Sequence, residues 1–577
     1  MDSKKVELNR PGTHSNREKG THNTIYPRLR GAAPGRLFST SFLAPPVKHL
    51  ELDQAKLLVN CAYYSDHYKG KLVVRIDDSG EPEKLSAKYE TSILQDLEVL
   101  GITPDDVSHS SDYFIRCEQL AEKLIIIGRA YMDIAPELSA KCRPSSFLSC
   151  IRRSPAESLQ LFKLLCLGHP EGRKYVLRAR IGLNRFSHEQ TLYFGNQDPI
   201  IYSHGNSVPH YRMDNDFSAY PSREFARPIV DAYEGISHII LTSEDEDDFY
   251  SWVQRSLQFY PTSISTFGKV EIVDNSNASQ HNPDSPGTVG SSFLLENLNH
   301  QPTLKELMRR GMSMVPLRAH LLSLGVSKKV TFVKWDSLWG ANRKFLEPLA
   351  PRFMAVRTKG CVRMSVKRSP KGSSSLVVPM HPRNDALGTR TLHIGNTVLL
   401  DGQDAESIEE GEEVTLLRWT SVLVTCIHRD LSRGTTQSLE SEYLPVFKFL
   451  KKKKAVTWLA DCQDLIPLTL VQFSAHPTIK TPKEDVPFFC GEGSFNPLPY
   501  PSCRSPRAVH VEALGDPSLC LLKENDLIQL ERLGFFRVDV PFVSIDEPMV
   551  LFMIPDGKNK SKNSSISSVS CQAAIDC

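Results

Sequence analysis

Residues 68–78, YKGKLVVRIDD, decide the fold of the amino-terminal half. Their centre, KLVVRI, is a short apolar run rich in branched side chains, which predicts a buried strand. The strand ends in Asp77 and Asp78, and residues 83–100 then carry apolar side chains at helical spacing. Because strands that alternate with helices build parallel sheets, whose ligands bind beyond the carboxyl ends of the strands, we expect both aspartates at a ligand-binding edge. Capping of the following helix is an equally weighted alternative.

The alternation of strands and helices continues to residue 259. Helical periodicity predicts helices at 115–127 and 249–259, and short apolar runs predict strands at 131–133, 175–181, 228–231 and 238–241. Residues 274–292 are nearly all turn formers and small polar residues, which predicts a flexible loop or insertion.

The carboxyl-terminal half has a different pattern. Helices are predicted at 303–311, 317–324 and 335–345, and strands at 392–394, 398–400, 413–417, 422–427 and 456–459. Short strands separated by turns are typical of small barrels, so we expect an all-β architecture beyond Pro351.

The composition restricts the class of protein. The chain has 577 residues, a hydrophobic fraction of 40% and a formal net charge of +2, so several domains are expected and the charge does not identify a partner. No apolar run reaches the length of a membrane span, so we expect no membrane partner. The 13 cysteines include no C-x-x-C pair, so we expect no metal site and interpret the thiols as reduced and intracellular.

Both ends of the chain are poor in apolar residues. We predict a disordered leader at residues 1–40 and a disordered tail at residues 546–577. The acid-free, arginine-containing end of the leader also fits a mitochondrial transit peptide. A solvated leader on a cytoplasmic protein is the preferred interpretation, and a mitochondrial location is the alternative.

Residues 68–78 resemble the YKGKLIVRFDD segment of glutamyl- and glutaminyl-tRNA synthetases. Other segments agree with that family in order and spacing, at 111–114, 121–124, 128–131, 228–231, 234–238, 307–312, 335–336, 348–352, 405–416, 457–461, 513–517 and 528–532. The resemblance spans residues 41–545. The pattern of short strands after Arg352 indicates β-barrels. This favours the glutamate enzyme of the eukaryotic and archaeal type, because the bacterial glutamate enzymes have helices in this region.

This resemblance implies an α/β Rossmann-like catalytic domain with an inserted acceptor-binding region and a short helical region, followed by two all-β barrels that bind the anticodon. The implied domains are the first Rossmann half at 41–140, the inserted region at 141–212, the second Rossmann half at 213–273, a flexible insertion at 274–298, a helical stem-contact region at 299–350 and the barrels at 351–545.

The family reaction joins glutamate to tRNA(Glu), with ATP and Mg²⁺. The glutamate carboxylate attacks the α-phosphate of ATP, and the acyl group then passes to the terminal ribose of the tRNA. Preorganised cations and N–H donors at the phosphates therefore carry most of the catalysis. The family supplies them from an H-I-G-H motif and a K-M-S-K-S-like loop. Here the motif falls on Glu51, Leu52, Asp53 and Gln54, and residues 270–304, which contain the loop position, have no Lys or Arg.

The family's amino-acid contacts are also partly altered. Asp77 keeps the carboxylate that contacts the amino end of the substrate, but the arginine and the tyrosine of that site fall on Ser41 and Arg223. A further family arginine falls on Leu241. The resemblance thus implies substrate binding by Asp77, Arg223 and the neighbouring Glu224.

The remaining implied contacts involve the nucleotide and the tRNA. Glu234 and His238 match a nucleotide-side segment, with a structural role as the alternative. The cationic run Lys451, Lys452, Lys453 and Lys454 matches the anticodon-side barrel and implies contact with tRNA phosphates, with a solvated loop as the alternative. The implied partners are tRNA(Glu), glutamate, ATP and other synthetases that assemble with this one.

Three explanations fit the altered motifs. The chain is a working glutamate–tRNA ligase with unusual residues, or a catalytically inactive tRNA-binding pseudo-synthetase, or an active enzyme whose sequence is wrongly assigned at 41–54 and 274–292. Arg223 and Leu241 lie inside otherwise intact segments, and an error of splicing does not make single substitutions. The sequence therefore favours an inactive site.

Overall fold

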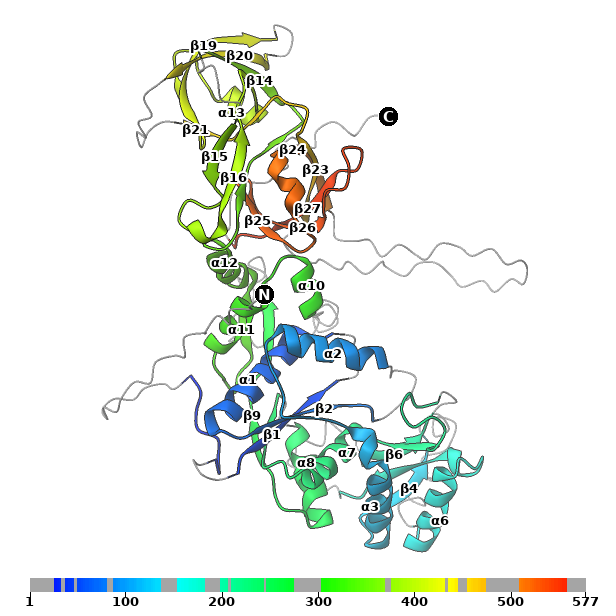
Figure 1. Cartoon of the computed structure of the whole chain (residues 1–577). Coiled ribbons are helices and arrows are strands. Elements are labelled where there is room, and N and C mark those ends of the chain that lie inside the picture. The colour runs from blue at the N-terminus through cyan, green and yellow to red at the C-terminus, as the bar shows by residue number, and fades with distance from the viewer. Residues whose placement is uncertain are drawn as a thin grey trace, which may run out of the picture.

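The computed structural model describes residues 25–32, 37–45, 49–79, 87–135, 153–181, 198–205, 209–242, 245–273, 302–368, 375–430, 434–444, 454–473 and 508–557. In Figure 1 these residues form an elongated molecule with three parts along its long axis. The amino-terminal sheet and the inserted region lie at one end, a group of helices lies in the middle, and the β-rich part lies at the other end.

A five-stranded parallel sheet forms the centre of the amino-terminal part, in the order β3-β2-β1-β8-β9. The strands are β1 (Ser39–Ala44), β2 (Lys71–Ile76), β3 (Asp106–His109), β8 (His238–Leu241) and β9 (Ser263–Thr266), and the helices beside them are α1 (Leu52–Tyr68), α2 (Ala87–Val99), α7 (Arg223–Tyr233) and α8 (Asp245–Leu257). β1 pairs in parallel with β2 and with β8. Five of the six residues in β2 are buried, as expected for a central parallel strand. The parallel α/β fold predicted from residues 68–78 is confirmed.

The inserted region follows β3 and forms a second sheet, which is antiparallel and has the order β4-β5-β6-β7. Its elements are β4 (Ala130–Ile134), β5 (Tyr175–Ala179), β6 (Ile200–His204), β7 (Ala219–Pro221), α3 (Phe114–Ile126), α6 (Pro155–Cys166) and the 3₁₀ helices η2 (Ser110–Tyr113) and η3 (Gly172–Lys174). Phe162 of α6 and Phe225 of α7 belong to one apolar core. This shared core fixes α7 between the two sheets.

The prediction of a strand at residues 228–231 is wrong, because these residues lie inside α7. The helix begins after Ser222, whose side-chain oxygen accepts a hydrogen bond from the backbone N–H of Phe225 at 3.3 Å. The branched pair Ile229 and Val230 favours a strand by local propensity, but both side chains are fully buried. Tertiary packing on this amphipathic helix overrides that weak preference.

The helices in the middle of the molecule are α10 (Leu304–Arg309), α11 (Met314–Ser323) and α12 (Trp335–Leu346), next to the parallel pair β10 (Val270–Val273) and β11 (Thr331–Lys334). They share a core with α1, which joins them to the five-stranded parallel sheet. They also pack tightly against the β-rich part, since a Cβ added at Gly311 would lie 2.5 Å from the side chain of Ile554.

The β-rich part contains two seven-stranded sheets. The first has the order β21-β18-β19-β20-β14-β17-β22, and its edge strands are neighbours in the chain, so it forms a nearly closed barrel. Its elements are β14 (Val362–Lys367), β17 (Thr397–Leu400), β18 (Glu413–Leu416), β19 (Thr420–Arg429), β20 (Thr436–Leu444), β21 (Lys454–Val456), β22 (Trp458–Ala460) and α13 (Gly402–Glu406). A hairpin of β15 (Ser375–Pro379) and β16 (Thr389–His393) lies beside it, joined through η5 (Asp385–Leu387).

The second β sheet is a more open half-barrel with the order β12-β25-β26-β27-β23-β24-β13. Its elements are β12 (Arg352–Phe353), β13 (Ala355–Arg357), β23 (Ile466–Phe473), β24 (Ala508–Gly515), β25 (Leu527–Leu530), β26 (Gly534–Val540), β27 (Met549–Ile554) and η6 (Pro517–Leu521). The all-β architecture predicted beyond Pro351 is confirmed. The tail prediction for residues 546–577 is wrong for β27, which pairs with β26 on one side and β23 on the other.

The prediction of a disordered leader at residues 1–40 is also wrong in part. Leu29 is buried, and its backbone N–H donates a hydrogen bond to the Tyr68 hydroxyl at 3.1 Å. The Tyr26 ring lies 4.0 Å from that of Tyr63 on α1. A few aromatic and aliphatic anchors hold this segment although its average composition is polar. Residues 1–24 lie outside the described part of the chain.

Two other predictions concern segments beyond the description. Residues 274–301, which include most of the expected insertion, lie outside the described residues, and so do 136–152 and 182–197 of the inserted region.

No described helix combines the length and the apolar character needed to cross a membrane.

Candidate functional site

A pocket opens at the carboxyl ends of β1 and β8, the edge at which a parallel sheet binds its ligands. Its cavity volume is about 50 Å³, and the pocket is partly open to solvent. The lining residues are Ser41, Phe42, Leu43, Leu57, Arg223, Arg227, Ile240, Leu241 and Thr242. Ser41 and Leu241, onto which two family arginines fall, therefore face the same space as Arg223 and Arg227 of α7. The charged groups of this lining are both guanidinium groups.

Asp77 lies directly after β2 and is bound by Arg223. The Nε of Arg223 is 3.1 Å from an Asp77 carboxylate oxygen, and the Ser79 hydroxyl donates to the other oxygen at 2.6 Å. Burial raises the pKa of Asp77, and the Arg223 guanidinium and the Ser79 hydrogen bonds oppose that shift. The carboxylate that the resemblance assigns to the amino end of the substrate therefore already has a cationic partner.

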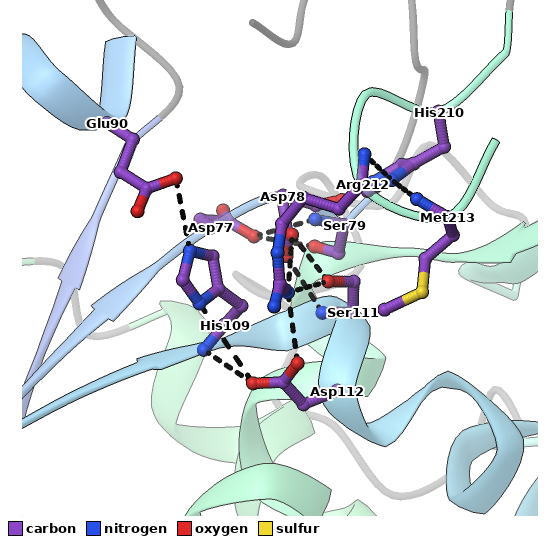
Figure 2. A network of polar contacts seen from close by, with 10 residues as sticks. All are labelled: Asp77, Asp78, Ser79, Glu90, His109, Ser111, Asp112, His210, Arg212 and Met213. Atoms are coloured by element: carbon purple, nitrogen blue, oxygen red, sulfur yellow. Dashed lines mark hydrogen bonds and ion pairs between the residues drawn. The ribbon is translucent and has the colours of Figure 1, made fainter. Parts of the chain in front are cut away.

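Asp78 belongs to a different network, which Figure 2 shows together with Asp77. Its carboxylate accepts hydrogen bonds from the backbone N–H and the hydroxyl of Ser111, at 2.8 and 2.6 Å. Arg212 reaches over the pair and donates to Ser111 and to Asp112, at 2.5 and 3.0 Å. Asp78 thus caps η2 at the end of the neighbouring strand and does not line the pocket.

The imidazole of His210 completes this network from the inserted region. Its Nε2 donates to the backbone carbonyl of Asp78 at 2.9 Å, and its Nδ1 accepts from the backbone N–H groups of Arg212 and Met213 at 3.2 Å. These contacts require the neutral tautomer with the proton on Nε2. The ring is fully buried, and it joins the inserted region to the five-stranded parallel sheet.

A buried charge cluster positions α7 behind the pocket. Arg75 of β2 is fully buried and pairs with Asp231 at 2.9 Å and with Glu234. Asp231 also accepts hydrogen bonds from the hydroxyls of Ser41, at 2.9 Å, and Tyr250, at 3.0 Å. Glu234, a proposed nucleotide ligand, therefore has a structural partner in Arg75.

His238, the second proposed nucleotide ligand, lies at the opposite end of β8 from the pocket. Its ring stacks on Phe38 at 4.7 Å, and its nitrogens contact the Ser237 hydroxyl at 2.8 Å and the backbone carbonyl of Arg30 at 3.2 Å. Burial lowers the pKa of His238. These contacts place His238 in the packing of the 25–32 segment. Glu224 is exposed in the first turn of α7.

The start of α1 carries the four H-I-G-H positions. Glu51 is the N-cap and forms a capping box with Gln54, whose side-chain oxygen accepts from the Glu51 backbone N–H at 3.0 Å. Leu52 is fully buried, and Asp53 accepts from the Gln54 N–H at 2.7 Å. Burial raises the pKa of Asp53, and the Gln54 N–H and Lys269 oppose that shift. Carboxylates at a helix start stabilise the helix, but they repel phosphate.

The residues at this end of α1 do not fit a triphosphate. The helix N-terminus is occupied by protein carboxylates, and the Leu241 position contributes no charge to the pocket. Within the described ranges, no group of three or more His, Cys, Asp and Glu side chains could hold a metal ion.

The lysine run is described only at its last member. Lys454 begins β21 and pairs with Glu412 at 2.9 Å, with two-fifths of its side chain exposed. Lys451, Lys452 and Lys453 lie outside the described residues.

Sequence reasoning missed Arg227 as a pocket residue. The signal that could have found it is its position four residues after Arg223, since helical residues at that spacing share one face.

Comparison with known proteins agrees with this geometry. The model described as "tRNA synthetases class I (E and Q), catalytic domain" matches residues 44–348, and two models of the anti-codon binding domain of the same class match residues 350–443 and 455–539. The "Probable glutamate--tRNA ligase, cytoplasmic" of Schizosaccharomyces pombe is 32% identical over 91% of this chain and 70% of that protein. The "Glutamate--tRNA ligase, cytoplasmic" of Saccharomyces cerevisiae is 32% identical over 91% of this chain and 71% of that protein.

Among solved structures, a glutamate tRNA ligase from Elizabethkingia meningosepticum in complex with its amino acid is similar, with a TM-score of 0.37 and 16% identity over 55% of this chain and 70% of that one. The catalytic match covers more than half of the present sequence, and the two yeast relatives align along nearly all of it. The chain therefore belongs to the class I tRNA synthetases for glutamate and glutamine, as a glutamyl-tRNA synthetase-like protein.

Proposed function

We propose that this protein binds tRNA(Glu) but does not form glutamyl-adenylate. The observation that carries the proposal is the start of α1, where Glu51 and Asp53 occupy the helix end that the family turns toward ATP. Two like charges 4 Å apart repel by about 4 kcal/mol at the effective dielectric constant of a protein surface. A triphosphate with Mg²⁺ would therefore meet repulsion at the place where the family offers donors.

The loss of cations at two further positions supports the same conclusion. Ser41 is held by Asp231, and Leu241 is fully buried. Removing one preorganised donor typically costs about 3 kcal/mol of transition-state stabilisation, and here several family donors are replaced together.

The tRNA part of the proposal is supported by the matched anti-codon binding domains at 350–443 and 455–539. We assign phosphate contacts to the run Lys451, Lys452, Lys453 and Lys454, of which Lys454 begins β21 at the edge of the nearly closed barrel. Lysine contacts with phosphate release bound counterions, so the affinity for tRNA should fall steeply as salt rises.

A working glutamate–tRNA ligase is the second candidate, and one observation favours it. The pocket keeps two guanidinium groups, those of Arg223 and Arg227, within a lining that is otherwise apolar or uncharged. In that case an unassigned cation would have to contact the phosphates of ATP.

The proposed location is the cytoplasm, since the two yeast relatives are named cytoplasmic. Other synthetases are proposed as assembly partners, because relatives from Drosophila melanogaster and Mus musculus are named bifunctional glutamate/proline--tRNA ligases. Co-elution of the full chain with prolyl-tRNA synthetase activity on size exclusion would test this partnership.

The central experiment combines two assays on the full chain. Exchange of pyrophosphate into ATP is measured with glutamate and tRNA present, with the Saccharomyces cerevisiae relative as the positive control, and a gel shift with total tRNA is measured across a salt series. The proposal predicts background exchange and salt-dependent binding of tRNA. Exchange above background would establish the working ligase, and absence of tRNA binding would refute the tRNA part.

A further inference from the structure

We propose that Glu531 and Arg532, at the turn between β25 and β26, clamp the half-barrel to the nearly closed barrel in one orientation and so act as positioning residues for the binding of tRNA. This role rests on the proposed function and deepens it, because it assigns the side chains that fix the two β sheets relative to each other. The clamp acts through the arrangement of the sheets and needs no contact with the RNA.

The two residues reach two separate elements of the nearly closed barrel. One carboxylate oxygen of Glu531 accepts hydrogen bonds from Nε and a terminal nitrogen of Arg418, at 3.0 and 2.6 Å. Arg418 lies in the turn between β18 and β19. The guanidinium group of Arg532 donates to both carboxylate oxygens of Asp404 on α13, at 2.7 Å for one of the two contacts. The turn of the half-barrel is therefore held from two sides, in each case by two donors.

The two ion pairs have opposite polarity, and this favours one register of the turn. Each sheet supplies one cation and one anion, since Arg418 and Asp404 belong to the nearly closed barrel. A displacement that exchanged the partners would bring guanidinium beside guanidinium and carboxylate beside carboxylate, and such repulsion disfavours the alternative arrangement. Glu531 is buried, so a turn displaced from Arg418 would leave its carboxylate unpaired, which is costly.

The backbone of the two arginines indicates that their side chains are needed at these positions. Arg418 and Arg532 both have a φ of 67°, in the left-handed region. A side chain crowds the backbone in this region, so glycine would be the residue of lowest cost. In both turns an arginine stands there instead, and in both its guanidinium group crosses to the other sheet.

A third contact fixes the beginning of α13. Arg357 of β13, in the half-barrel, binds both carboxylate oxygens of Asp401, the N-cap of α13, at 2.7 and 2.8 Å. The next residue, Gly402, approaches the backbone of Gly360 so closely that an added Cβ would collide with it. Because Gly360 lies in the segment that joins β13 to β14, α13 is held against the junction of the two sheets, and Arg532 binds it from the half-barrel.

A fixed orientation matters for tRNA because both sheets belong to the region matched by the anti-codon binding models. The match to residues 350–443 alone covers β12 and β13 of the half-barrel and β14 to β20 beside them. A large ligand that contacts two bodies binds more tightly when their orientation is fixed beforehand, because less freedom is lost on binding. Loosening the clamp should therefore weaken the binding of tRNA.

The test uses Asp404→Asn in the full chain, with two measurements. The change removes the anionic partner of Arg532 and raises the net charge by one, so direct attraction to phosphate predicts equal or tighter binding. The clamp predicts about tenfold weaker binding in a gel shift with total tRNA at one salt concentration, since charge-assisted hydrogen bonds correspond to roughly 10- to 100-fold in an equilibrium constant. It also predicts about tenfold faster hydrogen exchange of amides 531–533, which lie in the other sheet.

The matched control is Glu440→Gln, which makes the same change of charge in the same barrel. Glu440 of β20 pairs with Lys367 of the neighbouring strand β14 at 2.6 Å, so this exposed pair does not cross between the sheets. It should leave the exchange of amides 531–533 unchanged and should not weaken the binding of tRNA. A second variant, Arg532→Gly, suits the left-handed backbone and should therefore fold. It should weaken tRNA binding about as much as Asp404→Asn, and Arg532→Lys, which keeps the charge without the two-oxygen contact, should lie between.

The other outcomes each refute a definite step. Unchanged exchange of amides 531–533 in Asp404→Asn and Arg532→Gly would show that the two residues do not clamp the sheets. Faster exchange with unchanged or tighter binding of tRNA would show that the clamp has no positioning role. If the unaltered chain does not bind tRNA, the proposed function and the positioning role both fail, whereas normal binding by Asp404→Asn overturns the positioning role alone.

Discussion

Replacing Asp231 by Asn should loosen the five-stranded parallel sheet. Asp231 is fully buried and faces Arg75 at 2.9 Å, Arg227 at 4.0 Å, and the hydroxyls of Ser41 and Tyr250 at 2.9 and 3.0 Å. Asparagine keeps one oxygen but turns an NH₂ group toward donors, and it removes half of the negative charge that balances Arg75.

The expected cost follows from these contacts. Breaking a buried pair by neutralising one partner typically costs about 3–5 kcal/mol, and Glu234 still balances Arg75, so we expect about 3 kcal/mol. The assay is native-state hydrogen exchange of β1 and β2, because urea unfolding of several domains is not a single two-state transition. At 1.4 kcal/mol per tenfold, their amides should exchange roughly 100-fold faster.

The matched control is Glu171→Gln, which removes one partner of the exposed pair between Glu171 and Lys174 at 2.6 Å. An exposed ion pair contributes little to stability, so hydrogen exchange of β1 and β2 in Glu171→Gln should match that of the unaltered protein. If Asp231→Asn exchanges the amides of β1 and β2 no faster than this control, the cluster does not hold α7 to the sheet, and the reasoning is wrong.

Three further predictions test other parts of the fold. Burial lowers the pKa of Lys56 to about 8, so between pH 8 and about 10.5 the unfolded chain binds more protons than the folded chain. The stability contributed by Lys56 should therefore rise with pH through this window. Lys56→Met should remove that rise, as measured by thermal melts at pH 8 and at pH 10.5. Leu551→Ala, at a fully buried position of β27, should cost about 3 kcal/mol, read as faster hydrogen exchange of the β27 amides, whereas Val543→Ala at an exposed position should cost almost nothing, and equal effects would contradict the placement of β27. Ser111→Ala removes the hydroxyl that donates to Asp78 and should cost about 1–2 kcal/mol, read as faster exchange in η2, with unchanged exchange as the contrary result.

The parts of the fold that could be predicted are those in which local pattern records burial. The run KLVVRI is buried on both faces in β2, and its sequence is correspondingly apolar throughout. The run Met549–Ile554 is also apolar, and four of its six residues are buried, but its position after the last family segment led to its assignment to a disordered tail. In α7 the local pattern is misleading, since branched residues occupy a helix that only tertiary packing stabilises.

The candidate site was predictable in position but not in its contacts. Asp77 had to lie at the ligand edge, because topology places the end of every parallel strand there. The partner of Asp77 is Arg223, which is far away in the sequence. The partner of Glu234 is Arg75, 159 residues earlier in the chain. No local pattern encodes such pairings, and this is why a conserved-looking carboxylate such as Glu234 could be taken for a ligand.

The altered residues of the pocket are consistent with one another through Asp231. One of its oxygens receives Ser41 and Arg75, and the other receives Tyr250 and faces Arg227. A carboxylate has about four acceptor positions, so the three donors within hydrogen-bond distance leave Asp231 about one position for the nearby Arg227. An arginine at position 41, as in the family, would compete for these positions with Arg227. Serine at 41 and arginine at 227 are therefore compatible residues, whereas a sequence error confined to residues 41–54 would not produce an arginine on α7 that suits Ser41. This compatibility favours a pocket whose residues changed together over a pocket damaged at random.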